Sequence, residues 1–240
     1  RDKQEWRNMA TPSSVFSYIA AGGDVDVHVK GNHAILRAMD SDHIGMIEVE
    51  TGNQLDIPDG EYGGSLGGVS GNIGTYRYPE KILWDPELNQ LIIDKKGNQA
   101  VVDMEAGIEY AQLPQIKEGD TKGDLNLSRL SKALNNAWKH QKNEYNPSIS
   151  FKQQDNEITL EHADSEGNLR TETISLEHAQ GTQLASTSYN PEKLRNFLKI
   201  IETLDPEHVA IKQNEGQVLT LEAVKNDTVI RYHLAPMIGA

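Results

Sequence analysis

Short runs of alternating apolar and polar residues dominate the first quarter of the chain, which is the pattern of half-buried β-strands. Three such runs cover residues 25–30, 34–39 and 44–50. Gly31-Asn32 separates the first two runs, and an acidic segment at 40–42 separates the last two, so both junctions contain turn-forming residues. The pattern predicts a three-stranded antiparallel meander.

A strand and a short helix are expected before this meander. Residues 4–9 alternate weakly, and residues 11–14 have the composition of a helix start with a proline in the first turn. Apolar residues then follow at helical spacing until Gly22-Gly23 ends the pattern. The opening unit is therefore predicted to be strand, helix and three strands.

Two later segments also repeat apolar residues at helical spacing. The first runs from a Ser128 cap to about His140, and the second runs from Pro191 to about Thr203. The apolar stripes consist of Leu130, Ala133, Leu134, Ala137 and Trp138 in the first helix, and of Leu194, Phe197, Leu198 and Ile201 in the second. In the first half, residues 79–84 leave room for barely one helical turn before Asp85-Pro86.

The order of short motifs recurs in the second half of the chain, which indicates an internal duplication. The matched segments are 78–82 with 190–194, 85–87 with 205–207, 90–93 with 209–212, 99–104 with 218–222, 108–114 with 229–236, and 36–42 with 160–166. A polar segment without periodicity separates the halves. We therefore expect an α+β fold with two similar domains of repeated β-α-β-β-β units, at residues 1–113 and 124–240, joined by a linker at 114–123.

Charge is unevenly distributed along the chain. Its 36 acidic and 23 basic residues give a net charge of -13, which argues against ordinary nucleic-acid binding because phosphate neutralisation supplies non-specific affinity. The two later helices nevertheless place Lys132, Lys139 and Lys199 opposite their apolar stripes, with Lys193 and Arg195 beside them. Such lysines are usually only a solvated face. Their equivalent positions in a repeated unit favour a basic channel instead.

Composition and motifs give little support to enzymatic chemistry. The chain has no cysteine, so disulfides, thiolate zinc sites and cysteine nucleophiles are excluded. The glycine-rich segment 51–71 lacks the spacing of phosphate-binding loops and is expected to be a flexible loop. Asp40, Asp42 and His43 form no recognisable metal motif, and the eight histidines are scattered. We expect no catalytic residue, no metal and no cofactor.

The N-terminal residues are too charged for a signal peptide, and no apolar run approaches the ~18 residues of a membrane span. With 37% hydrophobic and 25% charged residues, the composition is that of a protein that buries a core. We expect a cytoplasmic protein without a membrane partner.

Two motifs carry a resemblance to a known family. The turn Ala38-Met39-Asp40-Ser41-Asp42-His43-Ile44 and the tail Leu234-Ala235-Pro236-Met237-Ile238 resemble the A-M-D-x-x-H-[VI] and L-A-P-x-I motifs of the PCNA type of DNA sliding clamp. The resemblance implies the DNA clamp fold and a homotrimeric ring that encircles duplex DNA as a processivity factor. It further implies non-enzymatic tethering of DNA polymerase, a clamp loader and other replication or repair proteins, in the nucleus if the source is eukaryotic.

The resemblance also implies three sets of site residues. DNA contacts are expected at Arg77, Lys81, Arg129, Lys132, Lys139, Lys193, Arg195 and Lys199. A pocket for a short apolar and aromatic docking peptide is expected from Met39, His43, Ile44, Leu113, Ile116, His233, Ala235, Pro236 and Ile238. Edge strands of neighbouring subunits are expected to pair through Ile108, Tyr110, Gln112, Leu169, Thr171 and Thr173.

Two alternatives stay open from the sequence. One is a subunit of a heterotrimeric or checkpoint-type clamp. The other, from a different class, is a metal-dependent carbohydrate or phosphate hydrolase that uses the glycine-rich segment.

Overall fold

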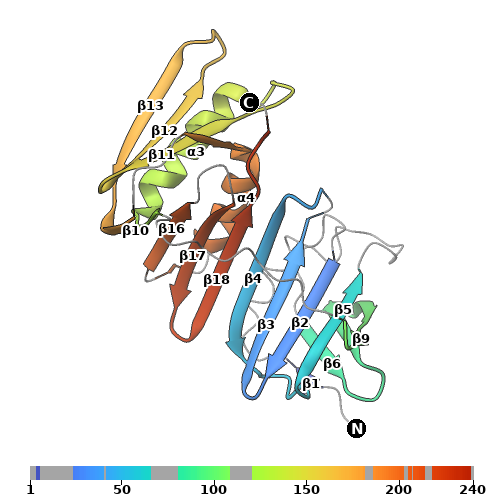
Figure 1. Ribbon diagram of the computed structural model, residues 1–240. Coiled ribbons are helices and arrows are strands. Elements are labelled where there is room, and N and C mark those ends of the chain that lie inside the picture. The colour runs from blue at the N-terminus through green and yellow to red at the C-terminus, as the bar shows by residue number, and fades with distance from the viewer. Residues whose placement is uncertain are drawn as a thin grey trace. The chain divides into compact units, whose positions relative to one another are not determined.

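The computed structural model describes residues 4–5, 24–40, 42–65, 81–108, 121–181, 186–202, 205–206, 208–213 and 218–238. The chain divides into two compact units (Figure 1). Unit 1 comprises Arg1–Leu113 and Lys225–Arg231, and unit 2 comprises Pro114–Val224 and Tyr232–Ala240. In the part of the chain described above, no helix is long and apolar enough to cross a membrane.

The described residues of unit 1 form two antiparallel sheets. The first has the strand order β4-β3-β2-β5-β9 and the second has the order β1-β6-β7-β8. The strands are β1 (Gln4–Glu5), β2 (Asp24–Lys30), β3 (His33–Met39), β4 (Gly45–Gly52), β5 (Gly60–Ser65), β6 (Lys81–Asp85), β7 (Gln90–Lys95), β8 (Asn98–Asp103) and β9 (Glu105–Ala106). The predicted meander at 25–50 is confirmed as β2, β3 and β4, whereas the strand expected at 4–9 is described only at Gln4–Glu5 and the helix expected at 11–21 lies outside the described residues.

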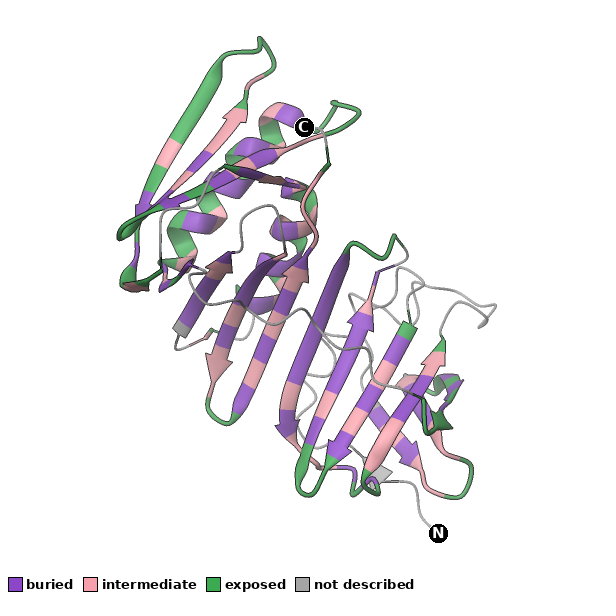
Figure 2. Cartoon of the chain, viewed as in Figure 1, coloured by how far each residue is buried: buried purple, intermediate pink, exposed green. Residues whose placement is uncertain are grey.

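Alternation of side chains explains why these segments form strands. Val25, Val27 and Val29 are almost fully buried on one face of β2, while the intervening residues are partly exposed (Figure 2). The rings of Tyr62 on β5 and Trp84 on β6 meet edge to face, with centroids 5.6 Å apart. Because β5 and β6 belong to different sheets, this aromatic contact joins the two sheets through the core.

The glycine-rich segment is only partly a loop, because Gly60–Ser65 forms β5. An added Cβ on Gly64 would lie 2.7 Å from the carbonyl oxygen of Asp103 and 2.7 Å from Cγ1 of Val102. Glycine at this position therefore permits β5 to approach β8 closely. The expectation of a flexible loop at 60–65 was wrong, since a run of glycines hides strand alternation.

Gly64→Ala is expected to destabilise unit 1 by about 1–3 kcal/mol, because the new methyl group has no space between β5 and β8. The midpoint of urea unfolding measures this loss. Gly52→Ala is the matched control, since its Cβ would meet nothing closer than 3.8 Å. Equal midpoints for the two variants would show that β5 and β8 do not pack as closely as described.

In its described residues, unit 2 contains two antiparallel sheets and two helices, and one sheet ends on β18, whose residues 228–231 are counted with unit 1. The strand orders are β14-β10-β16-β17-β18 and β13-β12-β11-β15. The strands are β10 (Thr121–Asp124), β11 (Ile149–Gln154), β12 (Glu157–Ala163), β13 (Leu169–Ser175), β14 (Glu177–Gln180), β15 (Thr187–Tyr189), β16 (His208–Gln213), β17 (Leu219–Lys225) and β18 (Thr228–Leu234). The helices are α3 (Leu127–Gln141) and α4 (Pro191–Glu202).

Both helices predicted for the second half are confirmed, with one correction at the start of α3. The side chain of Asn126, not Ser128, caps α3 by accepting a hydrogen bond from the Arg129 backbone N at 3.0 Å. Trp138 is only half-buried and lies at the margin of the apolar stripe. In α4, the Phe197 ring stacks on the Tyr232 ring of unit 2 at 4.7 Å, which anchors the helix to its sheet.

The strand orders confirm the duplication but correct its alignment. The order β1-β6-β7-β8 in unit 1 has the same form as β10-β16-β17-β18 in unit 2, so β6 is equivalent to β16. The sequence matches of 90–93 with 209–212 and of 99–104 with 218–222 were therefore wrong by one strand. The match of 78–82 with 190–194 was also wrong, because Lys81–Asp85 is a strand whereas Pro191 begins a helix.

Candidate functional site

The two helices of unit 2 carry positive charge in an acidic protein. Helix α3 contains three basic residues, Arg129, Lys132 and Lys139, and no acidic residue, whereas α4 contains three basic and two acidic residues. Their summed charge is +3 plus +1, or +4, while the whole chain has a net charge of -13. The side chains of Lys132, Lys139 and Lys199 are exposed. These two helices are therefore net positive in a chain that is net negative.

These exposed lysines differ from several cations on the strands. Four strand cations form ion pairs, namely Arg37 with Glu48, Lys212 with Glu222, Arg170 with Asp164 and Arg231 with Glu50. Within the described ranges, Lys132, Lys139 and Lys199 have no carboxylate within ion-pair distance. Their charge remains available for an anionic partner.

The two arginines of the helices are held by neutral groups. Nη2 of Arg129 donates to the carbonyl oxygen of Thr173 at 2.9 Å, and Nε of Arg195 donates to Oδ1 of Asn135 at 2.7 Å. Lys193 is half-buried at the side of α4. Of the remaining DNA-contact candidates, Arg77 lies outside the described residues, and Lys81 lies on strand β6 instead of the helical turn expected there.

Strand β13 is the outer strand of its sheet, with β12 as its neighbour. Leu169 is 63% exposed, Thr171 and Thr173 are also exposed, and Ile174 is the only fully buried residue of β13. An edge strand with an exposed leucine is a template for pairing with another chain. Ile108 is 40% exposed and follows β9, while its expected partners Tyr110 and Gln112 lie outside the described residues.

The acidic turn between β3 and β4 is organised by Asp40. Oδ1 of this buried residue accepts from the Ile44 backbone N at 3.0 Å, and its carbonyl oxygen accepts from the His43 backbone N at 3.1 Å. The turn after β12 has the same form, because Asp164 Oδ1 accepts from the backbone N of Asn168 at 2.8 Å and its carbonyl accepts from Gly167. The predicted match of 36–42 with 160–166 is thereby confirmed.

Residues 42–44 of this turn are exposed to solvent. His43 is exposed, with Nδ1 3.0 Å from Sδ of Met39, and Ile44 is 36% exposed. In unit 2, the tail after β18 is fastened by a hydrogen bond from the Met237 backbone N to the Ser188 carbonyl oxygen at 2.8 Å. Ile238 beyond it is 98% exposed. Neither isoleucine is therefore fully buried.

Other candidates for the peptide pocket are more enclosed. Ala235 and Pro236 are half-buried, and Nδ1 of His233 lies 2.9 Å from Oγ1 of Thr220. Leu113 and Ile116 lie outside the described residues. Since the candidates come from both units, a common pocket stays a prediction.

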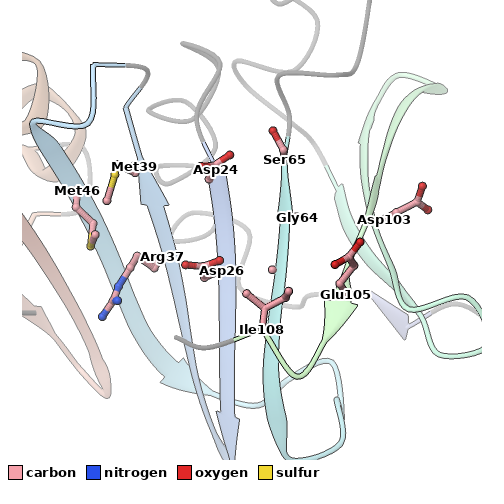
Figure 3. Close-up of a pocket in the computed structure, with 11 residues that line it drawn as sticks. Asp24, Asp26, Arg37, Met39, Met46, Gly64, Ser65, Asp103, Glu105 and Ile108 are labelled. Atoms are coloured by element: carbon pink, nitrogen blue, oxygen red, sulfur yellow. The ribbon is translucent and has the colours of Figure 1, made fainter. Parts of the chain in front are cut away.

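Sequence reasoning missed a cavity of about 480 Å³ on the first sheet of unit 1 (Figure 3). Its lining includes Asp24, Asp26, Asp103 and Glu105 around the single cation Arg37. Burial raises the pKa of Asp26, with Asp24 adding to the rise and Arg37 opposing it. Charged residues at alternate positions of β2 were the available signal, because they identify a polar face opposite the valines.

A second missed feature is a histidine pair in unit 2. Nδ1 of His140 on α3 lies 2.9 Å from Nε2 of His162 on β12, inside a cavity of about 360 Å³ that is also lined by Arg170 and Glu172. Burial and the neighbouring His140 lower the pKa of His162, while Asp164 opposes this shift and Arg170 adds to it. No sequence signal could have identified this pair, since 22 residues separate its members.

Unit 2 is expected to lose stability as the pH falls below the ordinary histidine pKa of 6.5 towards the lowered pKa of His162. In that window the unfolded chain binds the proton more tightly, so protonation favours unfolding. His162→Gln should therefore show a smaller drop in thermal midpoint between pH 7.5 and 5.0 than the wild type. The exposed His33→Gln is the control, and an identical drop for wild type and His162→Gln would contradict the expectation.

Within the described residues, no group of three or more His, Asp or Glu side chains is placed to hold a metal ion. In the acidic turn, for example, the Asp40 carboxylate accepts a hydrogen bond from the Ile44 backbone N.

Comparison with known proteins identifies the fold. No family model and no curated protein matches the chain. Among solved structures, PCNA from Thermococcus kodakaraensis matches with a TM-score of 0.69 and 13% identity, and the PCNA2-PCNA3 complex from Sulfolobus tokodaii matches with a TM-score of 0.68 and 13% identity. Each match covers 98% of this chain and 99% of the other chain. The expected α+β clamp architecture is thus confirmed, and the chain has the fold of PCNA over nearly its whole length.

Proposed function

We propose that the protein is a DNA sliding clamp that encircles duplex DNA and tethers replication or repair enzymes. The observation that carries this proposal is the match to PCNA structures over 98% of this chain and 99% of theirs. In this proposal, residues 1–113 and 124–240 are the two clamp domains and 114–123 is the linker. The role is one of binding, without catalysis or a cofactor.

The charge distribution supports a DNA-facing role for α3 and α4. Non-specific DNA binding has a dissociation constant of roughly 10⁻⁴ to 10⁻⁶ M at physiological salt. With association near 10⁸ M⁻¹s⁻¹, a bound complex would last only about 0.1 to 10 ms. A closed ring prevents escape regardless of affinity, so weak contacts from Lys132, Lys139 and Lys199 can permit sliding.

The exposed edge strand supports ring formation. We propose that β13 of one subunit pairs with the segment that begins at Ile108 in the next subunit, so that three copies close a ring and no edge remains open. Light scattering should then give three times the chain mass of 26.6 kDa. A monomer at working concentration would refute the homotrimer.

A heterotrimer is the second candidate, because one matching structure is a complex of two different proteins, PCNA2 and PCNA3. In that case the purified chain alone would have the mass of one or two copies. Addition of a related subunit from the same source would then produce the ring. A checkpoint-type clamp would behave in the same way.

Retention on DNA tests the function directly. A protein that encircles DNA should stay on closed circular DNA through gel filtration after loading, and should be lost when a nuclease linearises the circle. Equal loss from both forms would show simple binding and would reject the clamp proposal. The assay includes a clamp loader, because a closed ring has to be opened before circular DNA can enter it.

We further propose that clients carry a short peptide with apolar and aromatic residues, which docks on the acidic turn and the tail. Ile238→Asp is expected to lower the affinity for such a peptide at least tenfold, because a carboxylate would replace an apolar contact. The fold should be unaffected, since Ile238 is 98% exposed. Calorimetric titration measures the affinity, and unchanged binding would remove Ile238 from the pocket.

A further inference from the structure

Helices α3 and α4 pack against each other within unit 2, and a polar cluster lies at their contact. Asn135 and Trp138 are one turn apart on α3, where residues three positions apart are neighbours. Nε of Arg195 on α4 donates to Oδ1 of Asn135 at 2.7 Å, and its Cζ lies 5.9 Å from the centroid of the Trp138 ring. One amide and one aromatic ring therefore hold the same guanidinium.

This arrangement leaves a defined part of Arg195 available. Its Nε is occupied by Asn135, whereas neither Nη group has a hydrogen-bond partner among the residues the structure describes. The ring restricts the guanidinium from one side through a cation–π contact. The two terminal nitrogens form a planar fork, which is the geometry that binds two oxygens of a phosphate.

The surroundings indicate an anionic ligand. Lys199 follows Arg195 by one turn of α4, and Asn196 beside it is also exposed. No carboxylate is paired with Arg195 in the described part of the chain. Trp138 is only half-buried, whereas Leu130, Leu134 and Ala137 form the buried face of α3. Packing of the core therefore does not require a tryptophan beside Arg195.

We propose that Asn135 and Trp138 are positioning residues that hold the Nη groups of Arg195 for a DNA backbone phosphate. The inference rests on the proposed clamp function. The proposed role of Arg195 differs from that of the helix lysines, whose ammonium groups are point charges on flexible side chains. Because Asn135 and Trp138 already restrict the Arg195 side chain, forming its phosphate contact costs less conformational entropy than a lysine contact.

The test is binding of a short fluorescent duplex, measured by anisotropy between 20 and about 200 mM salt, with no need for ring closure. Arg195→Ala should remove one phosphate contact, which lowers affinity about fivefold per contact at about 0.15 M salt and reduces the salt slope by about 0.9. Asn135→Ala should lower the duplex affinity by at least half as much as Arg195→Ala does, when both losses are expressed as logarithms of the fold-change. Trp138→Leu should do the same, whereas Trp138→Phe, which keeps a ring, should bind nearly as the wild type.

Combination variants decide whether the three residues act together. Asn135→Ala and Trp138→Leu should have no further effect in the Arg195→Ala background, while Lys132→Ala should multiply with Arg195→Ala. The proposal would be overturned if the losses of affinity from the Asn135 and Trp138 variants multiplied with the loss from Arg195→Ala. It would also be overturned if the single variants bound the duplex as the wild type does. Asn135 is exposed, so Asn135→Ala keeps the test valid if Trp138→Leu fails to fold.

The outcomes distinguish this inference from the proposed function. A protein that binds the duplex through the cluster but forms no ring on circular DNA would disprove the clamp and keep the positioning role. A ring that slides normally with Arg195→Ala and Asn135→Ala unchanged in duplex affinity would keep the clamp and disprove the positioning role. Absence of duplex binding by the wild type at 20 mM salt would overturn the inference.

Discussion

Leu169→Glu is expected to convert the proposed ring into monomers. Leu169 is 63% exposed on the edge strand β13, so the isolated chain has no need of the leucine for its own folding. In a ring, the same position would be covered by the neighbouring subunit, and a buried unpaired carboxylate costs several kcal/mol. In a ring of identical subunits, the buried carboxylate is present at every subunit contact. Light scattering should show the mass of one chain, and retention on circular DNA should be lost.

Leu88→Glu is the matched control for this prediction. Leu88 is also 63% exposed, and it lies in the turn between β6 and β7, which contains none of the proposed contact residues. It should leave both mass and DNA retention unchanged. Dissociation by both variants would indicate a general effect of added charge, and an intact ring with Leu169→Glu would place the subunit contact elsewhere.

Replacement of Lys132, Lys139 and Lys199 by glutamate is expected to abolish loading and retention on DNA. The triple change makes each subunit more negative by six charges on the two helices that carry these exposed lysines. Loss of three phosphate contacts alone lowers duplex affinity at least a hundredfold at about 0.15 M salt, and repulsion adds to this. The fold and the ring mass should be unaffected, because all three lysines are exposed.

The control for the charge itself is a triple variant with Lys30, Lys122 and Lys152 replaced by glutamate. These lysines are exposed on strands β2, β10 and β11, so net charge changes equally while the helices stay basic. Retention should be close to that of the wild type at about 0.15 M salt, where charges more than about 8 Å apart are largely screened. Equal loss by both triple variants would show that overall charge, and not the helix face, governs DNA retention.

The elements of the fold were predictable because they depend on neighbours in the sequence. Alternating valines in β2 and the apolar stripe of α4 follow from burial of one face at a time, which is a local pattern. The basic helix faces follow from the same spacing. The start of α3 was misjudged by about two residues, because Asn126 and Ser128 are both good caps and only the backbone shows which one is used.

The alignment of the repeat was beyond local reasoning. Residues 79–81 and 191–193 both read Pro-Glu-Lys and each precedes an apolar residue, yet Ile82 and Trp84 are buried at alternate positions of a strand whereas Leu194 and Phe197 are buried at helical spacing. A short identical motif does not determine whether a strand or a helix follows when the next residues fit both the two-residue period of a strand and the 3.6-residue period of a helix. Strand pairing, which is a long-range property, assigned β6 to the position of β16.

The sequence by itself determined the fold class, the duplication, the two basic helices and the resemblance to PCNA, because each depends on spacing within a short window. Only the tertiary structure decided which charges are neutralised and which side chains are brought together. Arg37 meets Glu48 across two strands, His140 meets His162, and Arg195 meets Asn135 across 60 residues of chain. Such contacts are set by the packing of whole elements against one another, and among the described residues that packing also leaves three helix lysines without an acidic partner.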